Sequence, residues 1–176
     1  MKIGVFLDRD GTLIKDSGYI SSPDDVHVLP GVFEGLQLFK QNNYQLHIIS
    51  NQSGLNRGKF SKDEFDAVEA RVNLLFNERG IIFDSLNYCF HQPSDGCSCR
   101  KPKTGLLQQV ALTNGIEKSF AVMIGNSEVD RGAADSFGIR YWDVSDSAPA
   151  YQSYNSFPLV VSQIVKHFES ILHELE

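Results

Sequence analysis

Residues 3–14 read IGVFLDRDGTLI and combine a short apolar run with two acidic side chains. The run at 3–7 is too short for a typical helix and has the continuous apolar character of a buried strand. Asp8 and Asp10 follow it directly, and Gly11 permits a tight turn there. An isolated pair of this kind is more often a solvated surface turn than a functional site, so the rest of the sequence has to decide its interpretation.

Strand-like and helical segments alternate along the chain, and one helix opens with a capping box formed by Ser61 and Glu64. This alternation predicts an α/β fold, a Rossmann-like doubly wound parallel sheet in a single domain over residues 1–176. The predicted strands cover 3–7, 44–50, 81–90, 120–124 and 139–144, with 158–161 as a further edge strand. The predicted helices cover 30–41, 61–80, 104–113, 128–137 and 162–176.

The composition is that of an ordinary globular domain, with 41% hydrophobic and 22% charged residues among 176. The net charge of −6 disfavours nucleic acid as a partner, because phosphate backbones reward basic surfaces. A few local basic groups can still hold a small phosphorylated substrate. No apolar run approaches the ~20 residues that span a bilayer, and the first run is interrupted by Asp8. We therefore expect a cytoplasmic monomer that binds no membrane.

Polar residues follow three of the predicted strands. In open parallel sheets, the chemistry lies beyond the carboxyl ends of the strands. We therefore expect these side chains to meet at one edge of the sheet. The three pairs are Asp8 and Asp10 after the first strand, Ser50 and Asn51 after the second, and Asn126 and Asp130 after the strand at 120–124.

All three cysteines lie within residues 89–99, together with one histidine. A reducing cytoplasm and an odd number of thiols disfavour disulfides. Four soft or borderline ligands suit a tetrahedral, structural Zn²⁺ site with no open position, although a core histidine beside unrelated thiols is the alternative. The predicted ligands of this zinc loop are Cys89, His91, Cys97 and Cys99. Zinc would order the polar segment at 92–100 and fix the point where Arg100 and Lys101 emerge.

These motifs together resemble those of haloacid dehalogenase-type phosphatases, and they stand in the order of that family's four motifs. The four are Asp8-x-Asp10-Gly11-Thr12, Ser50-Asn51, Lys101-Pro102 and Gly125-x-x-x-x-Asp130. The closer resemblance is to heptose bisphosphate phosphatases and the related histidinol-phosphate phosphatases, and it covers roughly residues 3–140. It implies a minimal cap on the sheet, and the same zinc-bound loop occurs in both groups.

The resemblance implies an Mg²⁺-dependent phosphatase that works through an aspartyl-phosphate on Asp8. Asp10 would act as general acid and base, and the proximity of two carboxylates tends to raise the pKa of one of them. Ser50 would hydrogen-bond the phosphate, and Lys101 would neutralise its charge. The implied Mg²⁺ ligands are Asp8, Asp10, Asn126 and Asp130. The implied substrate-binding residues are Asp16, Gly18, Tyr19, Asn51, Gln52, Ser53, Arg57 and Arg100.

Two residues depart from the family pattern. Asn126 stands where the family normally has an Mg²⁺-binding aspartate, and its amide oxygen can coordinate the ion but brings no charge. Metal binding should be weaker, with Asp130 compensating directly or through a water. Ser127 stands where heptose bisphosphatases usually carry a lysine. These changes allow two interpretations: a tolerated substitution in an active enzyme, or a reduced-activity protein that binds a phosphosugar.

Different sequence features favour different substrates. The stretches DSGYI at 16–20 and NQSGLNRGKF at 51–60 resemble heptose bisphosphatases and favour the conversion of D-glycero-D-manno-heptose 1,7-bisphosphate to heptose 1-phosphate. The zinc loop is short, with five residues between His91 and Cys97, and in this it resembles the histidinol-phosphate phosphatases. A DNA 3′-phosphatase is a third hypothesis, disfavoured by the acidic chain and the lack of an evident basic groove.

Overall fold

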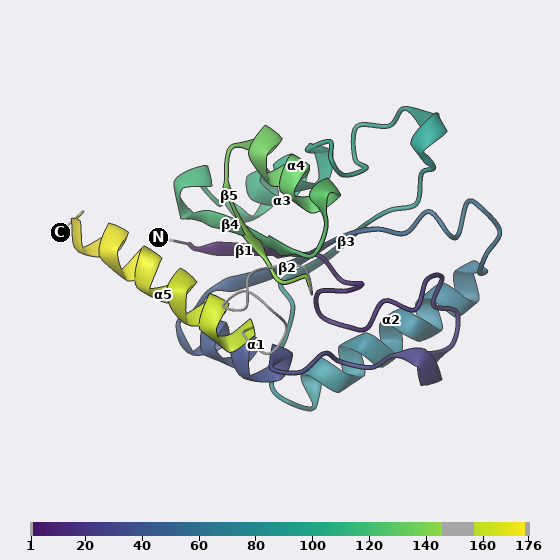
Figure 1. Ribbon diagram of the computed structural model, residues 1–176, viewed down its shortest axis with the longest axis horizontal. Helices are drawn as coiled ribbons and strands as arrows, with labels where there is room; N and C mark the ends of the chain where they lie inside the picture. Colours follow the sequence, from purple (N-terminus) through teal and green to yellow (C-terminus); the bar gives the residue numbers. More distant parts are fainter. Residues whose placement is uncertain (1, 146–156, 175–176) are drawn as a thin grey trace.

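All strands in the described part of the chain lie parallel in one sheet, in the order β3-β2-β1-β4-β5 (Figure 1). The computed structural model describes residues 2–145 and 157–174. The strands are β1 (Gly4–Leu7), β2 (Gln45–Asn51), β3 (Ser85–Cys89), β4 (Ala121–Gly125) and β5 (Arg140–Asp143). This arrangement confirms the predicted Rossmann-like parallel sheet. The predicted strand at 81–90 is shorter than expected, because 81–84 form the connection that leads into β3.

Helices cover both faces of the sheet, as a doubly wound fold requires. One face carries α1 (Val32–Gln41), α2 (Lys62–Asn77) and α5 (Phe157–Glu174), and the other carries α3 (Gly105–Asn114) and α4 (Glu128–Phe137). Successive side chains of β1 point to opposite faces of the sheet, and both faces are apolar and need cover. Val5 and Leu7 pack in the cluster with α1, α2 and α5, whereas Phe6 packs with α3 and α4. Within the described residues, no helix combines the length and apolar character that crossing a membrane requires.

The predicted edge strand at 158–161 is wrong, because this stretch forms the first turn of α5. Pro158 is compatible with that position, since the first N–H groups of a helix have no intrahelical partner. Val160, Ile164 and Phe168 follow at helical spacing and are buried in the cluster that includes α1. The helix predicted at 162–176 therefore begins earlier, at Phe157, and its last two residues lie outside the described part of the chain.

The topology brings three strand ends together at one edge. β1 is the central strand, and its end at Leu7 pairs with Ile48 of β2 on one side and Ile124 of β4 on the other. The chain winds outward in opposite directions from this strand, which makes it the topological switch point where ligands bind in such sheets. Figure 1 shows the loops after β1, β2 and β3 projecting from the end of the sheet opposite the two termini.

Candidate active site

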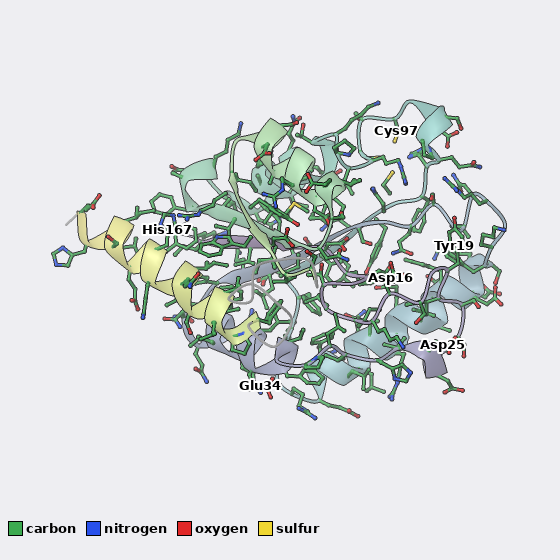
Figure 2. The ribbon with its side chains drawn as sticks, viewed as in Figure 1. Asp16, Tyr19, Asp25, Glu34, Cys97 and His167 are labelled. Carbon is green, nitrogen blue, oxygen red and sulfur yellow. The ribbon has the colours of Figure 1, made fainter. Side chains whose placement is uncertain are left out.

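A cavity of about 500 Å³ opens at this edge of the sheet and gathers most of the residues that the sequence singled out. Figure 2 labels two of them, Asp16 and Tyr19, on the long loop after β1. Arg57 and Arg100 are not among the lining residues. The lining consists of Asp8, Asp10, Asp16, Gly18, Tyr19, Ser50, Asn51, Gln52, Ser53, Lys101, Asn126 and Asp130, together with Gly54, Ser127 and Val129.

Lys101 occupies the centre of this site and is only 3% exposed. Its Nζ donates to Asp8 Oδ1 at 2.6 Å and to the main-chain oxygen of Ile49 at 2.6 Å. The same Nζ forms an ion pair with Asp130 Oδ1 at 2.5 Å. An ammonium has three hydrogens, and here each has its own oxygen partner. The lysine thus joins the residue after β1, the end of β2 and the first turn of α4.

Burial and charge shift the pKa values in this cluster. Burial raises the pKa of Asp8 to about 7, the negative charge of Asp130 adds to the shift, and the neighbouring Lys101 partly opposes it. Burial lowers the pKa of Lys101, but the two carboxylates outweigh this effect and raise its pKa above the ordinary value. One cation therefore stands between two buried carboxylates, and the cluster is deficient in positive charge.

Asn51 fixes the main chain at Lys101 through two reciprocal hydrogen bonds. Its Nδ2 donates to the carbonyl oxygen of Lys101 at 3.1 Å, and the Lys101 amide donates to its Oδ1 at 3.1 Å. Both polar ends of the side chain are thus engaged with Lys101, and they hold the lysine from the end of β2. Asn51 also lines the cavity, and its contact with substrate stays a prediction.

Asp10 is held by donors from two directions. Arg9 Nε donates to its Oδ1 at 2.9 Å, and Arg9 Nη2 donates to its Oδ2 at 3.0 Å. Gln52 Nε2 donates to Oδ2 at 2.6 Å and also to Ser50 Oγ at 2.9 Å. Charge-assisted, two-pronged contacts of this kind fix both the position and the orientation of a carboxylate.

The contacts of Arg9 were not anticipated from the sequence. Its remaining amino group, Nη1, pairs with Glu69 of α2 in the protein interior. One signal was present: Glu69 lies on the helix face that also carries Phe65, Val68 and Val72, where an acidic residue is rarely buried without a partner.

Asn126 lies close to Asp8, as its place after β4 requires. Thr12 Oγ1 is 3.4 Å from Asn126 Oδ1 and 3.5 Å from Asp8 Oδ2. Gly11 makes this approach possible, because a Cβ at that position would lie 2.1 Å from Asn126 Nδ2. Asp130 is fixed from the other side, where its Oδ2 accepts from Ser127 Oγ at 2.5 Å.

The three cysteines and His91 converge on the loop after β3, on which Figure 2 labels Cys97. Their four ligand atoms all lie within 4.8 Å of one another. Zinc–sulfur bonds of about 2.3 Å place two sulfurs of a tetrahedral site about 3.8 Å apart. The Sγ atoms of Cys89 and Cys97 are 3.7 Å apart, and His91 Nδ1 lies 3.6 Å from the Cys89 Sγ. The Cys99 Sγ lies closer, at 3.2 Å from both the Cys89 Sγ and His91 Nδ1. The number and type of these ligands fit a tetrahedral metal site.

The two arginines that the cavity lining lacks make local contacts. Arg100 Nη1 donates to the carbonyl oxygen of His91 at 3.1 Å and lines a neighbouring hollow of about 190 Å³, which also includes Lys101. Arg57 Nη1 lies 3.3 Å from the hydroxyl oxygen of Tyr19, a cavity residue. Neither arginine therefore lies in the cavity wall, but each adjoins a lining residue: Arg57 contacts Tyr19, and Arg100 precedes Lys101 in the sequence.

The fold and this cluster define the class of haloacid dehalogenase-type phosphatases, which are hydrolases of phosphate monoesters. The family model described as polynucleotide kinase 3 phosphatase matches residues 2–132, and the chain belongs to this family.

Named relatives lie close in sequence and in structure. The chain is 35% identical over 145 residues to the D-glycero-beta-D-manno-heptose-1,7-bisphosphate 7-phosphatase of Vibrio cholerae, with 78% of each chain covered. It is 33% identical over 147 residues to the histidine biosynthesis bifunctional protein HisB of Legionella pneumophila, covering 82% of this chain and 42% of that one. The D,D-heptose 1,7-bisphosphate phosphatase of B. bronchiseptica, solved with magnesium and phosphate, superposes with a TM-score of 0.84 at 28% identity, covering 95% of this chain and 99% of that one.

The lysine cluster leads to a first prediction, on stability without added divalent cation. Lys101→Met should lower the free energy of unfolding by about 3 kcal/mol at about pH 8, because it leaves two buried carboxylates uncompensated. The loss should be smaller at about pH 5, where a folded-state pKa near 7 lets Asp8 take up a proton. Urea unfolding at the two pH values measures both. Lys103→Met, on the exposed loop, is the control, and an equal loss at both pH values would contradict the account.

Proposed function

We propose that this chain is an Mg²⁺-dependent phosphatase that converts D-glycero-D-manno-heptose 1,7-bisphosphate to heptose 1-phosphate. The observation that carries the proposal is the buried cluster of Asp8, Lys101 and Asp130, at the floor of a cavity of about 500 Å³. A cavity of this size suits a small polar ester. Relatives that cover more than two thirds of the chain are named for the same substrate, which supports the choice.

The donor set fits a magnesium ion in its chemistry. Asp8, Asp10, Asn126 and Asp130 offer carboxylate and amide oxygens, which are the ligands that hard divalent cations prefer. Burial and the negative charge of Asp130 raise the pKa of Asp8 to about 7, so a divalent cation beside this carboxylate would stabilise its ionised form. Bound there, Mg²⁺ would reduce the repulsion between the Asp8 carboxylate and a phosphate dianion.

In the first chemical step, an oxygen of Asp8 forms a bond to phosphorus and the bond from phosphorus to the sugar oxygen breaks. Asp10 would act as the general acid that gives a proton to that leaving oxygen. Lys101 keeps the Asp8 side chain aimed through its contact at 2.6 Å, and its charge stabilises the transferring phosphoryl group. The product is an aspartyl-phosphate on Asp8.

In the second step, Asp10 takes a proton from a water molecule whose oxygen attacks phosphorus. The bond between Asp8 and phosphorus breaks, which releases inorganic phosphate and restores the carboxylate. Ser50 assists both steps: its Oγ accepts from Gln52, so that its hydroxyl hydrogen can be donated to a phosphate oxygen.

The remainder of the sugar would lie toward the loops at the cavity mouth. Asp16, Gly18 and Tyr19 border the cavity from the loop after β1, and Ser53 borders it from the loop after β2. Arg57 and Arg100 stand just outside this wall. Two guanidinium groups near the mouth supply planar, multidentate donors that suit the second phosphate of a sugar bisphosphate.

The cysteine cluster would hold a structural Zn²⁺. Burial raises the pKa of Cys89 to about 12, so a metal ion has to displace its proton on binding. The site supplies four ligands and no open position, which suits a structural and not a catalytic role. Its function would be to order the loop whose exit carries Arg100 and Lys101.

Two observations keep other functions in view. The HisB relative and the five-residue spacing between His91 and Cys97 favour histidinol phosphate as the substrate. Asn126 favours a reduced-activity protein that binds a phosphosugar without efficient turnover. A polynucleotide 3′-phosphate is disfavoured by the net charge of −6.

Phosphate release is the test of the proposed function. With Mg²⁺, the purified protein should release phosphate from heptose 1,7-bisphosphate with a higher kcat/KM than from histidinol phosphate or a 3′-phosphorylated oligonucleotide. Asp8→Asn should lower kcat by at least about a thousandfold, because it removes the nucleophile. Higher kcat/KM on histidinol phosphate would establish the alternative enzyme. Absence of turnover together with tight phosphosugar binding in calorimetry would identify a binding protein.

Asn126→Asp tests the metal site. The added charge should lower the Mg²⁺ concentration for half-maximal binding by about tenfold. Calorimetric Mg²⁺ titration measures this directly, whether or not the protein is active. Gln109→Glu adds the same charge on an exposed position of α3 and is the matched control. Equal Mg²⁺ affinity in the Asn126→Asp variant and the unmodified protein would exclude Asn126 from the metal site.

Cys99→Ser tests the zinc loop. The variant should bind less zinc and lose about tenfold in kcat, because a disordered loop misplaces Lys101. Metal analysis and phosphate release are measured on the same sample, with Ser98→Ala as the neighbouring control. Normal turnover by zinc-free Cys99→Ser protein would show that the loop needs no metal to present the lysine.

A further inference from the structure

We propose that Arg9 and Glu69, which are buried, and Tyr88, which is partly buried, form a relay that positions the carboxylate of Asp10 for the reaction. The inference rests on the proposed function, in which Asp10 exchanges protons with the leaving oxygen and the attacking water. None of the three touches the cavity: they are absent from its lining, although both sequence neighbours of Arg9 belong to it. They would act through Asp10 and are therefore positioning residues.

The first link is the two-pronged contact between Arg9 and Asp10. Two adjacent donors of the guanidinium, Nε and Nη2, meet the two oxygens of the carboxylate at 2.9 and 3.0 Å. This parallel geometry sets the plane of the carboxylate as well as its position, which a single-point contact cannot do. Gln52 Nε2 donates to Oδ2 from the cavity side at 2.6 Å, so the carboxylate is held between two side chains, those of Arg9 and Gln52.

The second link holds Arg9 itself. Its remaining amino group, Nη1, pairs with Oε1 of Glu69, and the other oxygen of Glu69 accepts from the Tyr88 hydroxyl. Arg9 is 1% exposed. Water therefore neither screens its charge nor competes for its hydrogen bonds. The relay thus runs from the loop after β1 to α2 and then to β3, and each member fixes the orientation of the one before it.

Stability alone does not explain this arrangement. Removing an arginine and a glutamate from water costs several kcal/mol for each ion, and well-packed apolar residues of similar size are often as stabilising or more so. The chain nevertheless buries Arg9 and Glu69 beside the apolar residues Phe65 and Val68 of α2. What the ion pairs add is a fixed orientation of the Arg9 guanidinium, and this group in turn orients the carboxylate of Asp10.

Glu69→Gln and Tyr88→Phe test the relay. Each removes one link while leaving the cavity wall intact, and Tyr88→Phe is the milder change if Glu69→Gln folds poorly. The expected result is a fall in kcat of about tenfold for Glu69→Gln and about threefold for Tyr88→Phe, with KM unchanged. Asp66→Asn removes an exposed carboxylate from the same helix, where it pairs with Lys62 at i,i+4, and should leave kcat unchanged.

Crystal structures of the variants give a second readout that does not need turnover. In Glu69→Gln, the Asp10 carboxylate should leave its two-pronged contact with Arg9 or show two orientations, whereas Asp66→Asn should keep a single one. A single, unmoved Asp10 in both relay variants, or a rise in KM without a fall in kcat, would overturn the inference. Failure of the proposed function is a different result: the unmodified protein would then release no phosphate from any ester, while the orientation of Asp10 would still decide the inference.

Discussion

The ammonium group of Lys101 is the contact on which the rest of the site depends. It binds Asp8 directly after β1, the carbonyl of Ile49 in β2 and Asp130 in the first turn of α4, and so it connects three elements that are separated by long stretches of sequence. Two buried carboxylates would repel each other without it. One ammonium group therefore faces two buried carboxylates in the wall of the cavity.

Much of the fold followed from local patterns. Apolar runs of strand length, alternating with amphipathic segments, were sufficient to predict the parallel sheet, and the capping box at Ser61 correctly located the start of α2. The prediction of a strand at 158–161 was wrong because four apolar residues fit a strand and a helix equally well. What decides it lies further on, where Ile164 and Phe168 continue the same buried face at helical spacing.

For the candidate site too, local sequence patterns predicted some features, whereas others depend on tertiary packing. Asp8, Ser50 and Asp130 could be grouped from sequence because parallel strands bring their carboxyl ends to one edge. The contacts of Arg9 and Asn51 could not, because each depends on a partner supplied by packing between elements far apart in the chain. A sequence shows which residues follow a strand, but not which of them turn inward to hold a neighbour.

The geometry of the loop that carries the cysteine cluster also bears on how such a site can diversify. The segment at 92–96 is bracketed by two members of that cluster, His91 and Cys97, and it lies outside the wall of the main cavity. Beyond it, the main chain is fixed again, since the Gly105 amide donates to the carbonyl oxygen of Ser98 at 3.0 Å. Insertions or deletions at 92–96 would therefore be absorbed between two anchored points. Such changes would alter the outer surface of the loop without moving the main chain at Lys101, which Asn51 holds from the end of β2.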